Sequence, residues 1–94
     1  MSENLVTRLV VEKTKVAEAR EYFQAMQADV FANEPDIVFY SFFQQQDRPE
    51  QFWVVEVFKD TKAMEFHLER HAWRVPDFDE ILSEPAEFNA VTEL

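Results

Sequence analysis

Two successive segments at the start of the chain differ in how their apolar and polar residues are spaced. Residues 5–11 form a short run rich in β-branched side chains, which predicts a strand. From residue 15 to residue 32, apolar side chains recur at spacings of three and four, the pattern of an amphipathic helix. Thr14 is the predicted N-cap of this helix, and Pro35 ends it.

The remaining pattern predicts a hairpin, a second helix and a final strand. Asp60 is the expected N-cap of the second helix, and Pro76 is expected to stop it. The predicted elements after the first helix are strands at 37–44 and 51–58 joined by a loop at 45–50, a helix from 60 to about 74, a helical turn at 78–82 and a strand at 86–94.

The order strand, helix, strand, strand, helix, strand is that of an α+β, ferredoxin-like fold. In this fold both helices cover the same face of a four-stranded antiparallel sheet. With 94 residues, the chain is long enough for one hydrophobic core and too short for two. We therefore expect a single domain spanning residues 1–94.

Both faces of the predicted sheet are apolar, although a sheet with helices on one face normally exposes polar side chains on the other. An exposed patch of this kind exceeds what monomers tolerate, so we expect another copy of the chain to cover it, in a homodimer or larger assembly. The alternative is that single surface apolar residues need no partner. Alternation places Ile37, Phe39 and Phe43 opposite Val38, Tyr40 and Phe42, and Trp53, Val55 and Val57 opposite Phe52, Val54 and Phe58.

Charge narrows the range of partners. The net charge is −10 and the nine Lys and Arg residues are scattered, so we expect no nucleic-acid partner. Residues 1–11 have neither the basic segment nor the long apolar run of a signal peptide or membrane span. We therefore expect a cytoplasmic protein that does not bind membranes.

Two residue types are absent from the chain. Without Cys there is no disulfide, thiolate nucleophile or Cys-ligated metal. Without Gly there is no dinucleotide fingerprint or phosphate loop of the usual kind. We also expect Asn and Asp to occupy any turn position that needs a positive φ angle, and the candidates are Asn33, Asp36, Asp47 and Asn89.

The second predicted helix carries the candidate chemistry. At about 100° per residue, His67 and His71 fall in the middle of its apolar arc, with Arg70 and Arg74 near the same arc. One interpretation is that the basic residues only stabilise the helix C-terminus, and we favour it for Arg74. The other is that His67 is a catalytic group in a pocket, with His71 and Arg70 binding the substrate.

The two histidines are also spaced i, i+4, which lets two imidazoles share a metal. The residue after His67 is Leu, so the zinc-protease arrangement with Glu after the first His is missing. With no third His and no Cys, the third ligand would have to be a carboxylate. We expect neither a metal nor another cofactor.

Glu56 lies among apolar neighbours on the predicted third strand, where a carboxylate needs a partner or a raised pKa. It either forms an ion pair with Arg8 or acts as an acid or base at the pocket wall. Tyr40 and Trp53 could line the substrate pocket or the dimer interface, and core packing is the better prediction for Trp53.

Several short motifs occur in order along the chain: Glu34-Pro35-Asp36, Glu56-Val57-Phe58, Ala63-Met64, and the spaced His67 and His71. In order and spacing, over nearly the whole chain, the sequence resembles the antibiotic biosynthesis monooxygenase family of dimeric α/β barrels. The resemblance implies a ferredoxin-like protomer, a dimer formed sheet to sheet, and a pocket between sheet and helices for small aromatic or quinol-like substrates. It also implies oxidation without a cofactor.

The chain departs from the usual family motifs at two positions. Asp36 replaces the glycine of Glu-Pro-Gly, and Phe58 replaces the tryptophan of Glu-x-Trp, where it would line the substrate pocket. The haem-degrading branch of the family resembles the chain only partly. Asn4 could stand for the first-strand asparagine of that branch, but Phe58 replaces its haem-contacting aromatic residue.

The leading hypothesis is a cofactor-independent monooxygenase that uses O₂ on a small phenolic or quinol substrate. His67, neutral and reachable near neutral pH, would remove the acidic proton, and His71, Tyr40 and Arg70 would orient or stabilise the anion. The runner-up is a non-oxidative isomerase or ligand-binding stress protein of the same architecture. A dimerisation module without a substrate is the third hypothesis, and fold alone does not choose among them.

Overall fold

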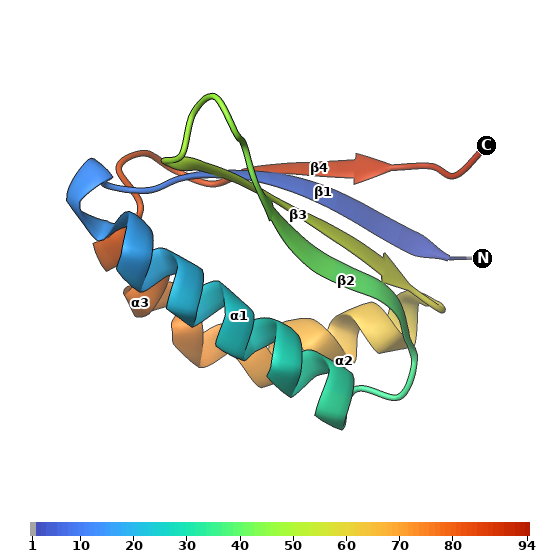
Figure 1. The fold of residues 1–94 in the computed structure, drawn as a ribbon. Coiled ribbons are helices and arrows are strands. Elements are labelled where there is room, and N and C mark those ends of the chain that lie inside the picture. The colour runs from blue at the N-terminus through green and yellow to red at the C-terminus, as the bar shows by residue number, and fades with distance from the viewer. Residues whose placement is uncertain (1) are drawn as a thin grey trace.

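The structure, a computed structural model, describes residues 2–94 and contains one sheet with helices packed against a single face (Figure 1). This α+β arrangement confirms the ferredoxin-like prediction. The elements in chain order are β1 (Glu3–Val10), the 3-10 turn η1 (Lys13–Lys15), α1 (Val16–Asn33), β2 (Ile37–Gln44), β3 (Gln51–Phe58), α2 (Thr61–His71), the 3-10 turn η2 (Ala72–Arg74), α3 (Val75–Ile81) and β4 (Glu87–Val91).

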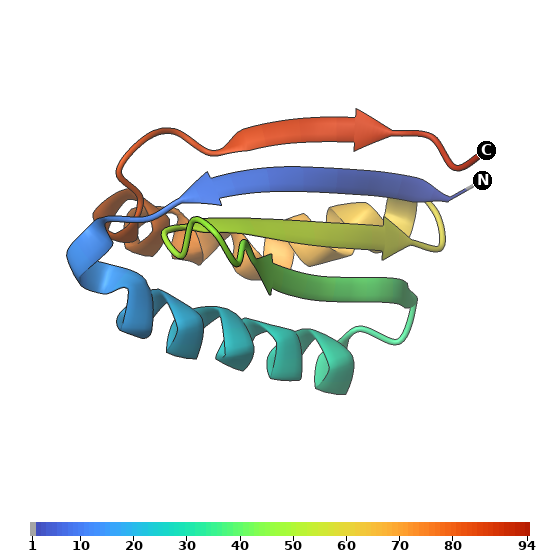
Figure 2. The same ribbon diagram turned by 45° about the horizontal axis from the view of Figure 1, so that its top comes forward.

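The four strands follow the order β2-β3-β1-β4, and every neighbouring pair is antiparallel. β1 and β3 are therefore the central strands, and β2 and β4 are the edges. α1 runs alongside β2, whereas β4 lies at the opposite edge of the sheet (Figure 2). We call the side of the sheet that faces the helices the inner face, and the other side the outer face.

The hairpin strands β2 and β3 have the bounds that alternation predicted. The start of the first helix differs, because Thr14 lies inside η1 and no side chain caps α1. The N-cap of the second helix is confirmed, since the Asp60 carboxylate accepts a hydrogen bond of 2.9 Å from the backbone N–H of Ala63. This cap sets where α2 begins and therefore which of its side chains face the sheet.

Pro76 does not stop the second helix, as the sequence had led us to expect. α2 already ends at His71, and after η2 the proline lies in the first turn of a further helix, α3. Proline suits this position because its fixed φ angle is helical and its missing N–H would have had no partner there. None of the helices in the described residues has both the length and the apolar composition needed to cross a membrane.

No described residue has a positive φ angle, so the expectation for the four Asn and Asp turn candidates was wrong. Asn33 is the last residue of α1 and Asn89 lies within β4. The loop of residues 45–50 between β2 and β3 is long enough to reverse the chain without a left-handed residue.

β2 contains a bulge near its start. Ile37 pairs with Phe58 and Phe39 pairs with Val57, so Val38 is an extra residue in this strand. The bulge moves Ile37 to the inner face, whereas simple alternation had predicted it on the same face as Phe39. The strand pattern predicted for residues 51–58 is confirmed, since Phe52, Val54, Glu56 and Phe58 are all buried on the inner face.

The hydrophobic core lies between the inner face and the helices. Phe23 of α1 is its centre, because its ring stacks on that of Phe42 at 4.5 Å and meets that of Phe52 edge-on at 5.1 Å. These contacts fix α1 against the edge of the sheet formed by β2. α2 covers the part of the inner face over β3 that α1 leaves uncovered.

The outer face is apolar, as predicted. Phe39 and Phe43 are 42% and 50% exposed, and Trp53 in the neighbouring strand is partly exposed. Val6, Val55, Val57 and Val91 extend the same surface across the other strands. An aromatic and aliphatic patch of this kind favours association with a second copy, which stays a prediction.

Replacing Phe43 by Asp should disrupt this association, because an unpaired charge is costly in an apolar interface. We expect the wild-type protein to run as a dimer or larger species, and Phe43→Asp to run as a monomer or to aggregate. Light scattering coupled to size exclusion measures the mass. Phe31→Asp on α1, where Phe31 is 59% exposed, is the matched control and should leave the mass unchanged.

A wild-type protein that stays at 11.2 kDa across micromolar concentrations would rule out the assembly.

Candidate functional site

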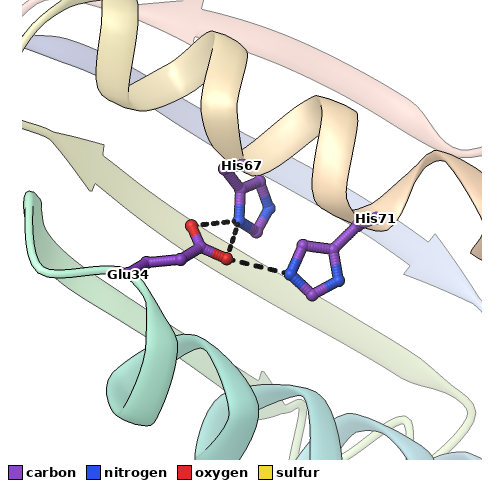
Figure 3. Close-up of side chains that lie close together, drawn as sticks. All are labelled: Glu34, His67 and His71. Atoms are coloured by element: carbon purple, nitrogen blue, oxygen red, sulfur yellow. Dashed lines mark hydrogen bonds and ion pairs between the residues drawn. The ribbon is translucent and has the colours of Figure 1, made fainter.

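α2 presents a polar stripe to the inner face. Ala63, His67 and His71 are its buried residues, and their spacing of four places them on one side of the helix. Figure 3 shows both imidazoles pointing from α2 toward the side chain of Glu34. The predicted histidine pair is therefore directed into the protein rather than into solvent.

Glu34 is the centre of the site. It follows the last residue of α1, and its backbone N–H donates to the carbonyl of Val30 at 2.9 Å, which closes the helix end. Its carboxylate is 3% exposed and lies 2.8 Å from His67 Nδ1 and 2.9 Å from His71 Nε2. Arg70 Nη1 donates to the same carboxylate at 2.6 Å. One buried carboxylate thus accepts hydrogen bonds from three side chains of α2.

His67 is held on both ring nitrogens. Opposite Glu34, its Nε2 lies 3.2 Å from Oε1 of Glu56 on β3. The rings of Tyr40 and Phe58 lie 5.2 Å from the imidazole, and the residue is only 4% exposed. His67 therefore bridges two buried carboxylates inside an aromatic enclosure.

The two histidines differ in protonation. Burial alone would lower the pKa of His67, but the hydrogen bond to Glu56 and the charge of Glu34 outweigh it and raise the pKa. Burial lowers the pKa of His71, and the positive charge of His67 adds to this effect against the hydrogen bond to Glu34. These directions favour the imidazolium form of His67, which has a carboxylate at each ring nitrogen, and the neutral form of His71.

The charges around the cluster balance. Arg70 also forms an ion pair with Asp29 of α1, with 3.0 Å between Nη2 and Oδ2. Burial alone would raise the pKa of Asp29, but the hydrogen bond from Arg70 and its charge lower that pKa. Three carboxylates and three cations then meet at this place: Asp29, Glu34 and Glu56 with His67, Arg70 and Arg74. A protonated His67 therefore leaves the cluster close to neutral, which a buried charge network requires.

Burial, followed by the charges of Glu56 and Glu34, raises the pKa of Tyr40 far above its ordinary value. Its phenol therefore stays neutral at physiological pH.

Glu34, His67 and His71 could also supply metal ligands, because one atom from each lies within 4.8 Å of the others. Oε2 of Glu34, the oxygen that faces His71, already accepts a hydrogen bond from Arg70 Nη1 at 2.6 Å. A guanidinium at that distance places positive charge where a metal ion would bind, and His67 would have to lose its proton. The residues present fit a hydrogen-bonded cluster better than a metal centre.

Six of the predicted site residues meet in this cluster, and one does not. His67, His71, Arg70, Glu56, Tyr40 and Phe58 converge on the inner face. Trp53 lies on the outer face, so its assignment to the substrate pocket and to the core was wrong. The cause is the strand period, since odd-numbered residues of β3 point away from the helices.

Two other expectations need correction. Arg8 is not the partner of Glu56, because it lies on the outer face and contacts Gln51 at 2.9 Å and Glu84 at 2.7 Å. His67 is not the neutral, reachable imidazole that the sequence led us to expect, because it is buried and its pKa is raised. Asn4 also lies on the outer face, paired with Val57, and is separated from Phe58 by the sheet.

Sequence reasoning missed Glu34 as a site residue and Asp29 as the second partner of Arg70. Asp29 carries no signal beyond its place on a polar helix. Glu34 does, because it begins the Glu34-Pro35-Asp36 motif at a helix end. The motif contributes to the family resemblance, but the sequence alone does not show that the Glu34 carboxylate is buried.

A groove of about 300 Å³ is lined by residues that neighbour Glu34 and His67 in the sequence. Its walls include Pro35, which follows Glu34, and Phe66, which precedes His67. Ile37 gives it an apolar wall and Lys62 a positive charge. The carboxylate of Asp36 also lines the groove, so it offers apolar contact and one charge of each sign. Its volume is at the small end of the range for small-molecule sites.

The sequence and fold are similar to those of known proteins. The sequence profile of the family described as antibiotic biosynthesis monooxygenase matches residues 4–75. Among curated proteins, none matches the sequence. Solved structures match the fold over nearly the whole chain.

A protein from Caulobacter crescentus, named as a candidate antibiotic biosynthesis monooxygenase, has a TM-score of 0.89 and 19% identity, over 99% of this chain and 90% of that chain. A conserved protein from Methanosarcina mazei has a TM-score of 0.88 and 20% identity, over 100% of this chain and 94% of that chain. A protein from Mycobacterium tuberculosis has a TM-score of 0.88 and 14% identity, over 100% of this chain and 96% of that chain. At such identities these likenesses show the fold alone.

The opposite pKa shifts of the two histidines predict a stability maximum near the ordinary histidine pKa of about 6.5. The raised pKa of His67 stabilises the folded protein below that pH, and this contribution is lost as the pH rises through the folded pKa. The lowered pKa of His71 has the opposite effect, so stability falls as the pH drops below the same value. Urea unfolding at a series of pH values measures both slopes.

His67→Gln should remove the loss of stability above the maximum and keep the loss below it. Equal slopes above the maximum in wild type and His67→Gln would show that His67 is not the charged group.

Proposed function

Because the chain belongs to the antibiotic biosynthesis monooxygenase family, we propose that it is a cofactor-independent monooxygenase that oxidises a small phenolic or quinol substrate with O₂. The proposal rests on one observation beyond the family: the buried chain of hydrogen bonds and ion pairs from Glu56 through His67 to Glu34. Such a chain can take a proton from a bound phenol and stabilise the anion that remains.

Glu56 is the proposed proton acceptor. Its Oε1 faces His67 at 3.2 Å, and within residues 2–94 no ion pair or hydrogen bond is formed by its second oxygen, Oε2. A carboxylate with one free oxygen can accept the phenolic proton, while the neighbouring imidazolium stabilises the phenolate by its charge. His67 is therefore a catalytic residue in this proposal, but as the charged partner of Glu56.

The groove provides the place for the aromatic ring. Ile37 and Phe66 supply apolar walls, and Lys62 attracts the phenolate. Ile37 and Phe58 form the cross-strand row next to that of Tyr40 and Glu56 on the inner face. Tyr40, Glu56 and Phe58 are buried and do not line the groove, so the proposal requires that they become accessible when the ring binds. Arg70 and His71 would hold Glu34 in position.

The reaction balances without a further oxidant. A phenol with a hydrogen at the para carbon loses its hydroxyl proton, and the phenolate gives electrons to O₂. One oxygen atom forms a bond to the para carbon and becomes the second carbonyl of a quinone. The other leaves as water with the two hydrogens that the substrate has lost.

Replacing Glu56 by Gln tests the proton acceptor directly. The amide oxygen still accepts from His67, so the fold should be kept, but it cannot take up the proton, so the rate should fall by about 10²–10⁴-fold. Oxygen uptake in the presence of a metal chelator measures it, with 1,5-dihydroxynaphthalene as a quinol-like substrate that keeps a hydrogen para to each hydroxyl. Glu69→Gln on the exposed side of α2 is the matched control and should keep the wild-type rate.

Uptake by Glu56→Gln at the wild-type rate would remove Glu56 from the mechanism. A wild-type protein that binds the quinol but takes up no oxygen would refute the monooxygenase and leave a ligand-binding protein of the same fold.

A further inference from the structure

Arg74 lies beyond the proposed reacting groups, at the end of η2, and its guanidinium is held in one orientation. Its Cζ lies 4.3 Å from the ring centre of Trp73 and 5.3 Å from that of Tyr22. Tyr22 in turn donates a hydrogen bond of 2.7 Å to Asp77 of α3. Aromatic rings on α1 and η2 thus flank the guanidinium of Arg74 and leave its Nε–H free for a partner.

That N–H points at His71. The distance from Arg74 Nε to His71 Nδ1 is 2.9 Å. A guanidinium has donors only, so Nδ1 must be the accepting, unprotonated nitrogen of the ring. The proton of neutral His71 then resides on Nε2 and is donated to Oε2 of Glu34 at 2.9 Å. Arg70 Nη1 also lies 3.5 Å from Nε2, but the carboxylate is the closer partner.

We infer that Arg74 is a positioning residue, which holds His71 as the neutral Nε2–H tautomer so that His71 donates to Glu34 and fixes the carboxylate against His67. If the proton moved to Nδ1, the Nε2 lone pair would face a carboxylate oxygen at 2.9 Å, and the two would repel. Glu34 would then turn away or take up a proton, and His67 would lose its partner.

The groups around His71 determine its charge as well as its tautomer. Within the described residues the ring faces Asp29 at 3.6 Å, Glu34 at 2.9 Å, Arg70 at 3.5 Å and Arg74 at 2.9 Å, and its centre lies 4.5 Å from that of His67. Two guanidiniums and an imidazolium oppose a further positive charge there. Arg74 therefore keeps His71 neutral by its charge and sets the tautomer by its N–H.

The test separates these two effects with a matched pair of variants. In Arg74→Gln the amide nitrogen occupies the same place along the side chain as Nε and keeps an N–H donor without the charge. In Arg74→Met that place holds a methyl group, which donates nothing. Heteronuclear NMR of the histidine rings on the resting protein reports which nitrogen carries the proton.

We expect the Nε2–H tautomer of His71 in wild type and in Arg74→Gln, and a loss of that form toward Nδ1–H or a mixture in Arg74→Met. Arg48→Met, in the exposed β2–β3 loop, is the control and should keep the wild-type spectrum. An unchanged His71 tautomer in Arg74→Met would overturn the inference. So would identical changes in Arg74→Gln and Arg74→Met, because charge alone would then explain them.

A purely structural role through stacking is distinguished by Trp73→Leu. This change removes the ring on which Arg74 stacks and should lower stability in the unfolding experiment, while the Nε–H bond keeps the His71 tautomer. If Trp73→Leu alters the tautomer as Arg74→Met does, packing and not the hydrogen bond sets it, and the inference fails.

The activity measurement rests on the proposed function. With His71 displaced, Glu34 holds His67 less firmly, so oxygen uptake should fall by about tenfold or more in Arg74→Met and less in Arg74→Gln. Equal rates in Arg74→Met and wild type would contradict a positioning role. Because the NMR measurement needs no substrate, an inactive wild type would refute the monooxygenase proposal and still leave the role of Arg74 open to test.

Discussion

Burial of the Glu34 carboxylate is the constraint on which the arrangement of the helices depends. A carboxylate removed from water is destabilising by several kcal/mol unless it is hydrogen-bonded and its charge is compensated. Glu34 meets this condition only when α2 brings His67, Arg70 and His71 to it together. A shift of α2 by one residue would break all three contacts. The junction of α1 and β2 is therefore joined to α2 at one position, which hydrophobic packing alone would not specify.

The two faces of the sheet have separate roles because side chains alternate along each strand. On β3, Glu56 and Phe58 point inward to the charged cluster, whereas Trp53, Val55 and Val57 point outward to the apolar face. Neither face can be exchanged for the other, since a register slip of one residue would place Glu56 on the outer face. The charged site and the apolar outer face are thus built from the same strands without sharing a side chain of β3.

The sequence predicted the elements better than the contacts between them. β2 and β3 follow from local alternation, and the cap at Asp60 from local hydrogen bonding. The position of Ile37 depends on the bulge at Val38, which no local pattern marks. The partner of Glu56 depends on where α2 crosses the sheet, and so it is His67 and not Arg8. Glu34 was missed for the same reason, because its donors lie more than thirty residues further along the chain.

The protonation of the cluster decides where a reaction can begin. Two flanking carboxylates stabilise the protonated form of His67, which disfavours this imidazole as the first group to take a proton from a substrate. A neutral His67 would leave Glu34 and Glu56 with too little positive charge between them, and the cluster would be destabilised. In the proposed mechanism proton removal therefore begins at Glu56, whose second oxygen has no partner among the described residues. The charge of His67 would then stabilise the anion that is formed, so the buried carboxylates that hold its proton would also prepare it for catalysis.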